Sequence, residues 1–279
     1  MRRCIACLAA GRTRSAGNVV NWIETAVAAT SVAGLAVGGF MYAALWPESQ
    51  IFGWTMRGGD DPREIALTFD DGPNDACTGD LLDVLARHDV RATFFMVGQY
   101  VLQSPGLARR VREAGHVVGN HTVTHPLLAK IGPRRVREEL AGCKAILEDT
   151  LGEPVRYFRP PFGGRRPDVL RTARELGMIP VTWNVTGYDW AQKSADEVYG
   201  IVKAGIARNE KRGRGSNVLL HDGGHLTMGA DRSRTVRAVE MLLAQDAILT
   251  PLKPKPGLNG AVGRKFVTVD AWDSLGPQF

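Results

Sequence analysis

Beyond residue 63 the chain alternates short apolar runs with amphipathic stretches, and this alternation constrains the fold most. The runs have the length of strands, whereas Arg134–Leu151 repeats apolar residues at helical spacing. Strands that alternate with helices favour a parallel sheet covered by those helices. We therefore predict an α/β fold, a (β/α) barrel with about seven parallel strands, short of the usual eight. A doubly wound open sheet is the alternative. No G-x-G-x-x-G or P-loop follows the first strand, which excludes the commonest nucleotide-binding sites.

The apolar runs and the stretches between them set the expected elements. The predicted strands are Glu64–Asp70, Arg91–Val97, His116–His121, Arg156–Pro160, Ile179–Val185, Asn217–Asp222 and Lys265–Val269. The predicted helices are Gly79–Arg87, Leu107–Glu113, Arg134–Leu151, Asp168–Leu176, Ala195–Ala207 and Arg232–Gln245.

Residues 26–46 carry no charge, and a helix over them would rise about 31 Å, close to the thickness of a bilayer core. We expect a single-pass transmembrane anchor; a buried core helix and a cleaved signal peptide are the alternatives. Arginines precede the segment, so the positive-inside rule places the N-terminus in the cytoplasm and the rest in the periplasm or outside the cell. The predicted organisation is a short basic cytoplasmic segment (1–25), an anchor in the cytoplasmic membrane (26–46), a linker (47–63) and one large domain (64–279).

The charge and the cysteine count exclude two classes of protein. Lys and Arg number 35 against 29 Asp and Glu, and basic residues do not interleave with aromatic ones, so we expect no nucleic-acid partner. Four cysteines in 279 residues exclude a disulfide scaffold. Cys77 and Cys143 lie in the exported part, where they could pair. The position of Cys143 on the apolar stripe of a helix favours a buried thiol instead.

Polar residues gather where the strands end. Asp70 and Asp71 end the first strand before a Gly-Pro turn. Neighbouring side chains of a strand point to opposite sides, which suits one carboxylate as a metal ligand and the other as a base. His121 and His125, four residues apart, could chelate one ion and complete a His₂-carboxylate site of the kind that holds catalytic Zn²⁺. A solvated turn and a lone histidine pair are the non-catalytic interpretations.

Three later strand ends extend this pattern. After Arg159 two prolines lack N–H groups, so the first free backbone donor is on Phe162, as an oxyanion hole requires. Arg159 could hold a carboxylate in a two-pronged contact, and a stiff loop with a surface arginine is the alternative. His221 ends an apolar strand, and Asp189 from the adjacent strand end could orient it as an acid. We interpret His225 as a loop residue. Polar clusters at successive strand ends mark the active-site face of an α/β barrel.

The motifs TFDDGP, HTVTH, RPPFG, GYDW and LLHD, in this order, resemble those of the NodB-homology polysaccharide deacetylases, carbohydrate esterase family 4. The resemblance covers roughly Glu64 to Val269. It implies a deformed (β/α) barrel and metal-dependent removal of N-acetyl, sometimes O-acetyl, groups from sugars. It also implies that a divalent metal is bound by Asp71, His121 and His125. Zn²⁺ is the first choice, with Co²⁺, Mn²⁺ or Ni²⁺ as alternatives.

The resemblance assigns further roles residue by residue. Asp70 would be the general base, and Arg159 would orient it. His221 would protonate the leaving amine, tuned by Asp189, which Arg91 would support in the family's pattern. The Phe162 N–H would stabilise the oxyanion, and the acetyl methyl would lie against Trp190 and Leu219. The chain departs from the family at Phe162, often Tyr, and at Thr186, often Asp.

The expected substrate is an N-acetylated envelope or extracellular glycan: peptidoglycan, a chitin-like oligomer, an exopolysaccharide or a lipid-linked sugar. A related metal hydrolase of a non-sugar amide and a non-catalytic glycan-binding module are the alternatives. The sequence leaves the choice of glycan and the oligomeric state open.

Overall fold

The computed structural model describes residues 30–31, 34–191, 193–246 and 263–276, and it divides into two units, Met1–Tyr42 and Ala43–Phe279. The described residues of the first unit are helical and exposed. Part of the predicted anchor, residues 26–29 and 32–33, lies outside the described residues, as does the predicted cytoplasmic segment. Among the described residues, no helix combines the length and the apolar character that crossing a bilayer needs.

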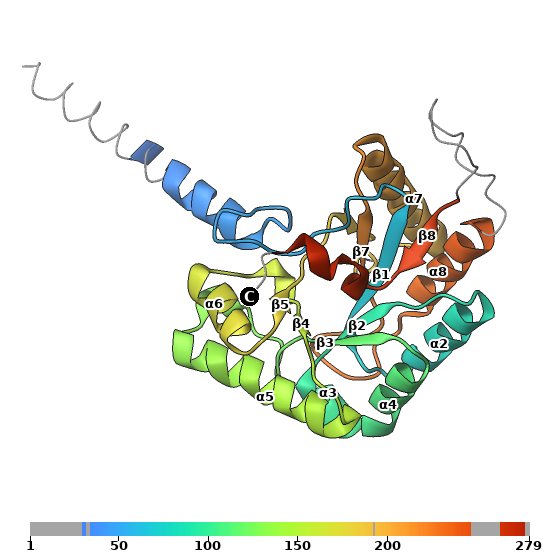
Figure 1. The fold of residues 1–279 in the computed structure, drawn as a ribbon, viewed down its shortest axis with the longest axis horizontal. Helices are drawn as coiled ribbons and strands as arrows, with labels where there is room; N and C mark the ends of the chain where they lie inside the picture. Colours follow the sequence, from blue (N-terminus) through green and yellow to red (C-terminus); the bar gives the residue numbers. More distant parts are fainter. Residues whose placement is uncertain (1–29, 32–33, 192, 247–262, 277–279) are drawn as a thin grey trace, which may run out of the picture. The chain divides into compact units, whose positions relative to one another are not determined.

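The second unit is built on a curled parallel sheet in the order β5-β4-β3-β2-β1-β7-β6, with β8 paired to the start of β1 (Figure 1). The strands are β1 (Glu64–Gly72), β2 (Thr93–Met96), β3 (Val117–Asn120), β4 (Tyr157–Phe158), β5 (Ile179–Pro180), β6 (Val185–Thr186), β7 (Ser216–His221) and β8 (Lys265–Val267). Every pairing between these strands is parallel, so their carboxyl ends meet at one edge. The predicted α/β class and barrel-like sheet are confirmed, as a half-barrel that stays open between β5 and β6.

Helices lie around the outside of the sheet (Figure 1). They are α2 (Thr78–Arg87), α3 (Gly98–Gln103), α4 (Pro105–Glu113), α5 (Pro133–Leu151), α6 (Pro167–Glu175), α7 (Ala195–Lys211) and α8 (Ser233–Asp246), with 3-10 turns at Leu128–Lys130, Pro161–Gly163 and Val269–Leu275. Local signals explain several helix ends. Proline occupies the first turn of α4, α5 and α6, where its missing N–H costs nothing. Ser194 and Glu197 form a capping box on α7, and Gly152 ends α5 at a φ of 70°.

The structure differs from the prediction in two places. The expected strand Ile179–Val185 is two short strands, because β5 pairs with β4 at one edge and β6 pairs with β7 at the other. The chain between them crosses the opening of the half-barrel, where Val181 bridges to Met56. The short helix α3 was not predicted. These differences depend on pairings between distant residues, which a local pattern does not contain.

The alternation along β1 separates the core from the site. Ile65, Leu67 and Phe69 face the helices in the main apolar cluster, whereas Ala66 belongs to a second cluster inside the barrel. Because side chains alternate along a strand, Thr68 and Asp70 share the inner side with Ala66. One strand thus contributes to both the core and the site.

The expectation that Cys77 and Cys143 could pair is wrong. Both are free, buried thiols. The Cys143 thiol lies 3.6 Å from the backbone oxygen of Met96, whereas the Cys77 sulfur accepts a hydrogen bond from the Arg232 N–H. The predicted buried thiol at Cys143 is confirmed, and burial raises its pKa to about 12.

Candidate active site

Asp70 lies at the inner face of β1 in a buried ion pair with Arg159. The Nη1 of Arg159 donates to Asp70 Oδ1 at 2.8 Å and to Thr68 Oγ1 at 2.7 Å. The Arg159 guanidinium lies 4.2 Å from the centre of the Phe95 ring, and its Nη2 donates to Asn217 Oδ1. Both charges are buried, so the pair needs these extra hydrogen bonds to offset desolvation. The predicted contact between Arg159 and a carboxylate is therefore present, and the alternative of a surface arginine is wrong.

Asp71, His121 and His125 offer ligand atoms that lie within 4.8 Å of one another. Asp71 Oδ1 is 3.1 Å from His125 Nε2 and 3.5 Å from His121 Nε2. The His121 Nδ1 lies 2.8 Å from the carbonyl oxygen of Arg159, which orients the other ring nitrogen toward the cluster. Asp71, Thr122 and His125 all have positive φ. Such conformations cost free energy, and they turn the chain so that His125 comes back beside His121.

The donor set of this cluster fits a divalent cation. The Asp71 Oδ1 is buried and has no hydrogen-bond partner among the described residues. Burial raises the pKa of the Asp71 carboxyl, but the close imidazoles of His121 and His125 outweigh it, so the pKa is lowered well below its usual value. An ionised carboxylate and two imidazoles are the ligands of catalytic zinc sites, which leave a position open for water or substrate.

His221 forms a second buried pair, with Asp189. Its Nδ1 lies 2.9 Å from Asp189 Oδ1, and its backbone N–H donates to Oδ2 of the same carboxylate at 2.8 Å. The Thr235 hydroxyl also donates to Oδ2, at 2.8 Å. Burial lowers the pKa of His221, but the charge and hydrogen bond of Asp189, with the charges of Asp71 and Asp70, raise it to about 9. The imidazole is therefore protonated at neutral pH, as a general acid requires.

One cavity of about 280 Å³ joins the cluster to one member of each pair, Asp70 and His221. It is lined by Asp70, Asp71, His121, His125, Phe162, Trp183, Trp190, Leu219, His221 and His225. The register Asp70↔His221 between β1 and β7 places the expected base and acid at the same level of the sheet. Of the apolar side chains that line the cavity, Phe162 and Trp190 are half exposed, whereas Leu219 is buried. The Phe162 N–H makes no hydrogen bond to the described residues, so it is free for an oxyanion.

Sequence reasoning missed or misplaced three residues. Trp183 lines the cavity, but a tryptophan in a predicted strand gives no signal that separates it from the core. His225 does lie on a loop, yet its ring stacks on His125 with centroids 5.2 Å apart. Arg91 does not support Asp189: it lies beside Gly115 at the opposite ends of the strands. Hydrogen bonds from Thr235 and His221 hold Asp189 instead.

Comparison with known proteins places this geometry in a family. Residues 57–181 match the family model described as polysaccharide deacetylase. A chitooligosaccharide deacetylase of Bradyrhizobium sp. is 40% identical over 188 residues, which are 65% of this chain and 83% of that protein. The chain belongs to the polysaccharide deacetylase family. The predicted family and the predicted class of enzyme, a hydrolase of N-acetyl amide bonds, are thereby confirmed.

Further relatives of the family agree with this placement. A peptidoglycan-N-acetylglucosamine deacetylase of Bacillus cereus is 34% identical, covering 80% of this chain and 72% of that one. The crystal structure of the Bc1960 peptidoglycan N-acetylglucosamine deacetylase superposes with a TM-score of 0.64 at 32% identity, over 78% of this chain and 91% of that one. BA3943 of Bacillus anthracis, described as a CE4 family pseudoenzyme, superposes with a TM-score of 0.58 at 26% identity, over 68% and 62%.

Proposed function

We propose that this deacetylase hydrolyses the N-acetyl groups of sugar residues in an envelope or extracellular glycan, with a divalent metal at Asp71, His121 and His125. The observation that carries the proposal is the single cavity in which these ligands meet Asp70, which pairs with Arg159, and His221, which pairs with Asp189. A base, a cation site and a protonated acid at one carbonyl are what amide hydrolysis without a covalent intermediate needs.

A cation at this site would supply Lewis acidity, and the two imidazoles with one carboxylate favour Zn²⁺. Asp70 accepts a proton from the attacking water, whose oxygen forms the new bond to the acetyl carbon. Arg159 holds Asp70 Oδ1, so Oδ2 remains to take the proton. The Phe162 N–H stabilises the developing oxyanion. His221 gives its proton to the nitrogen as the C–N bond breaks, and acetate and the free amine leave.

Acetate release tests this function directly. The full-length protein, loaded with Zn²⁺, is offered chitooligosaccharides, peptidoglycan and other N-acetylated polysaccharides, because the relatives named above are deacetylases of the first two kinds. We expect release from at least one glycan and a loss of about 10²-fold or more in Asp70→Asn. Asp196→Asn removes an exposed carboxylate on α7 and is the matched control. No release from folded, metal-bearing protein on any glycan would favour a non-sugar amide or a binding module.

We also propose that the apolar segment predicted at residues 26–46 anchors the protein in the cytoplasmic membrane through the part before Ala43, where the deacetylase unit begins, with that unit in the periplasm or outside the cell. The lack of charge in this segment supports it, as do large exposed apolar side chains at Leu35, Val37, Phe40 and Met41. Cell fractionation tests it: we expect the chain in the membrane fraction after an alkaline carbonate wash, and cleavage by protease added to spheroplasts. Recovery in the soluble fraction would contradict the anchor.

A further inference from the structure

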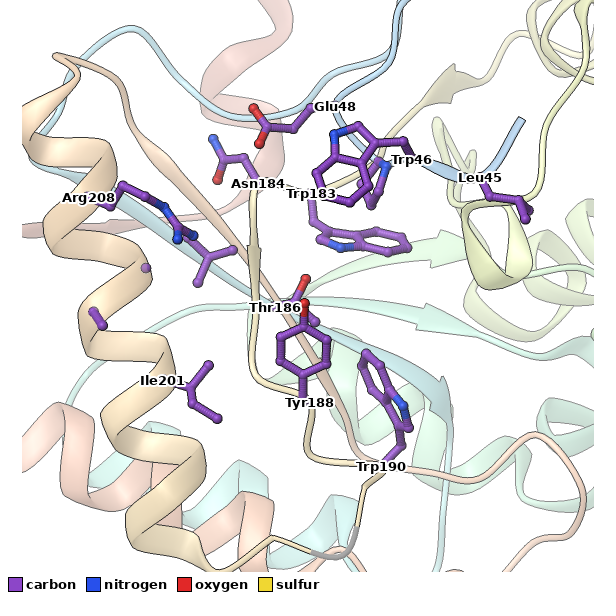
Figure 2. A pocket seen from close by; sticks show the side chains of 14 residues that line it. Leu45, Trp46, Glu48, Trp183, Asn184, Thr186, Tyr188, Trp190, Ile201 and Arg208 are labelled. Atoms are coloured by element: carbon purple, nitrogen blue, oxygen red, sulfur yellow. The ribbon is translucent and has the colours of Figure 1, made fainter. Parts of the chain in front are cut away.

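A second cavity, of about 480 Å³, adjoins the catalytic one and shares Trp183 and Trp190 with it. Figure 2 shows Trp46 above Trp183, with Tyr188 and Trp190 across the cavity from them. Trp46, Tyr188 and Trp190 are each about half exposed. We call the space bounded by these four aromatic side chains the aromatic cavity. Its volume falls within the range of about 300–1,000 Å³ that is usual for ligand sites.

Hydrogen bonds hold Trp46 against the deacetylase unit, although it precedes the residues that match the family model. The buried guanidinium of Arg165 donates to the carbonyl oxygens of Trp46 at 2.5 Å and Ser49 at 2.8 Å. The Arg165 N–H donates to the carbonyl oxygen of Ala44 at 3.0 Å. This segment, which the sequence assigned to the anchor and linker, therefore forms a fixed wall of the aromatic cavity.

Among the described polar side chains that line the aromatic cavity, Arg208 is the charged group that remains for a ligand. Arg208 extends from α7 toward the aromatic side chains (Figure 2), and its side chain has no hydrogen bond or ion pair among the described residues. Asn184 is already used, because its Nδ2 donates to the Gly215 carbonyl and its Oδ1 accepts from Asn209. Glu48 is paired with Arg214 at 2.7 Å. Arg208 is thus the charged group best placed to meet a ligand.

We propose that the aromatic cavity binds the sugar residue next to the one that is deacetylated, with Trp46 and Arg208 as its specificity-determining residues. A pyranose ring presents a face of C–H groups that packs on an aromatic ring, and its hydroxyl and carbonyl oxygens accept hydrogen bonds from a guanidinium. Because Trp183 and Trp190 line both cavities, the two cavities adjoin, as the sites of two linked sugars must. This inference rests on the proposed deacetylase function, which it extends to substrate length.

The dependence of rate on chain length tests the proposal. With the full-length protein, kcat/KM is measured for chitooligosaccharides of increasing length. We expect the wild type to prefer longer oligomers, and Trp46→Ala to reduce the ratio of long to short by about fivefold. Trp46→Phe keeps a ring and should retain most of the preference. Leu102→Ala removes an exposed apolar side chain of α3, outside the aromatic cavity, and is the matched control.

A second variant tests the polar contact. Arg208→Gln should also reduce the preference for long oligomers, mainly through KM, whereas Lys211→Gln, an exposed lysine one turn further along α7, should not. Calorimetry of a long oligomer with Asp70→Asn, alone and combined with Trp46→Ala, reads the same contact without turnover, and the double variant should bind more weakly. Acetate release by the wild type with an unchanged length ratio in Trp46→Ala and Arg208→Gln would overturn the aromatic cavity as a sugar site. No acetate release by the wild type would instead contradict the proposed function.

Discussion

At the scale of single residues, the charge of His221 depends on Asp189. The carboxylate contacts both the ring Nδ1 and the backbone N–H of His221, and the Asp189 side chain is buried. A cation bound at Asp71 would offset the negative charges of Asp71 and Asp70. Asp189 is therefore the partner that keeps the pKa of His221 high in the metal-loaded enzyme.

We predict that Asp189→Asn moves the alkaline limb of the kcat/KM profile to lower pH. The sign follows from the two opposing effects: burial lowers the pKa of His221, and Asp189 raises it. Without the carboxylate only the lowering effect and the weaker charges remain, so the acid loses its proton at lower pH and the rate at pH 7 falls. The profile is measured from acetate release beside Asp196→Asn. An alkaline limb at the same pH in Asp189→Asn would contradict the assigned role.

Several site residues could be predicted from the sequence, because carboxylates and histidines that directly follow apolar strands indicate a functional site at the strand ends. The positions of Asp70, Asp71 and His121 in one cavity agree with that expectation, as does the contact of Asp189 with His221, which lines the same cavity. The role of Arg165 could not be predicted, because its guanidinium donates hydrogen bonds to carbonyl oxygens of a segment more than a hundred residues away in the sequence. Arg91 was misplaced because it precedes its strand and therefore lies at the opposite edge of the sheet.

At the scale of elements, β3 supports the site through a contact that only glycine permits. A Cβ on Gly119 would lie 2.5 Å from the Phe95 ring, which in turn packs against the Arg159 guanidinium. We predict that Gly119→Ala destabilises the fold by about 1–3 kcal/mol and lowers the rate of deacetylation, because the ring is pushed toward Arg159. Urea unfolding measures the first effect and acetate release the second.

Gly106→Ala is the matched control for this prediction. It lies in α4 with nothing within 4 Å of the added Cβ, so alanine should be neutral or stabilise by up to about 1 kcal/mol. Equal stability of Gly119→Ala and the wild type would show that Phe95 moves freely and does not link β3 to Arg159.

Elements with local signals were the predictable ones. The proline at the start of α5 and the apolar spacing along it indicated that helix, and the structure has it at Pro133–Leu151. The split of the fifth strand into β5 and β6 was not predictable, because it follows from which distant strands, β4 and β7, each half pairs with. Loop closure across the half-barrel is a property of the whole sheet.

At the scale of the whole molecule, a buried histidine limits stability in acid. His116 accepts a hydrogen bond from the Ala92 N–H at Nδ1, and burial, with the charge of Arg91, lowers its pKa to about 4. Between about pH 6.5 and 4, His116 is protonated in the unfolded chain but stays neutral in the folded chain. The free energy of unfolding therefore falls as the pH drops through this range, by up to about 3 kcal/mol.

We predict that His116→Gln reduces the loss of stability between pH 7 and pH 4.5, because the replacement does not titrate. Urea unfolding at the two pH values measures the difference, with His88→Gln, at the half-buried end of α2, as the control. The same loss in His116→Gln as in the wild type would assign acid sensitivity to other groups.

The division between a metal ligand and a base is tested most directly by measuring bound metal and acetate release on the same samples of wild type, Asp71→Asn and Asp70→Asn. We predict that Asp71→Asn loses both metal and turnover, because it removes the only carboxylate of the ligand cluster found among the described residues. We predict that Asp70→Asn keeps the metal and loses turnover by about 10²-fold or more, because it removes the base alone. Full metal and activity in Asp71→Asn, or undiminished turnover in Asp70→Asn, would contradict the division between a ligand and a base.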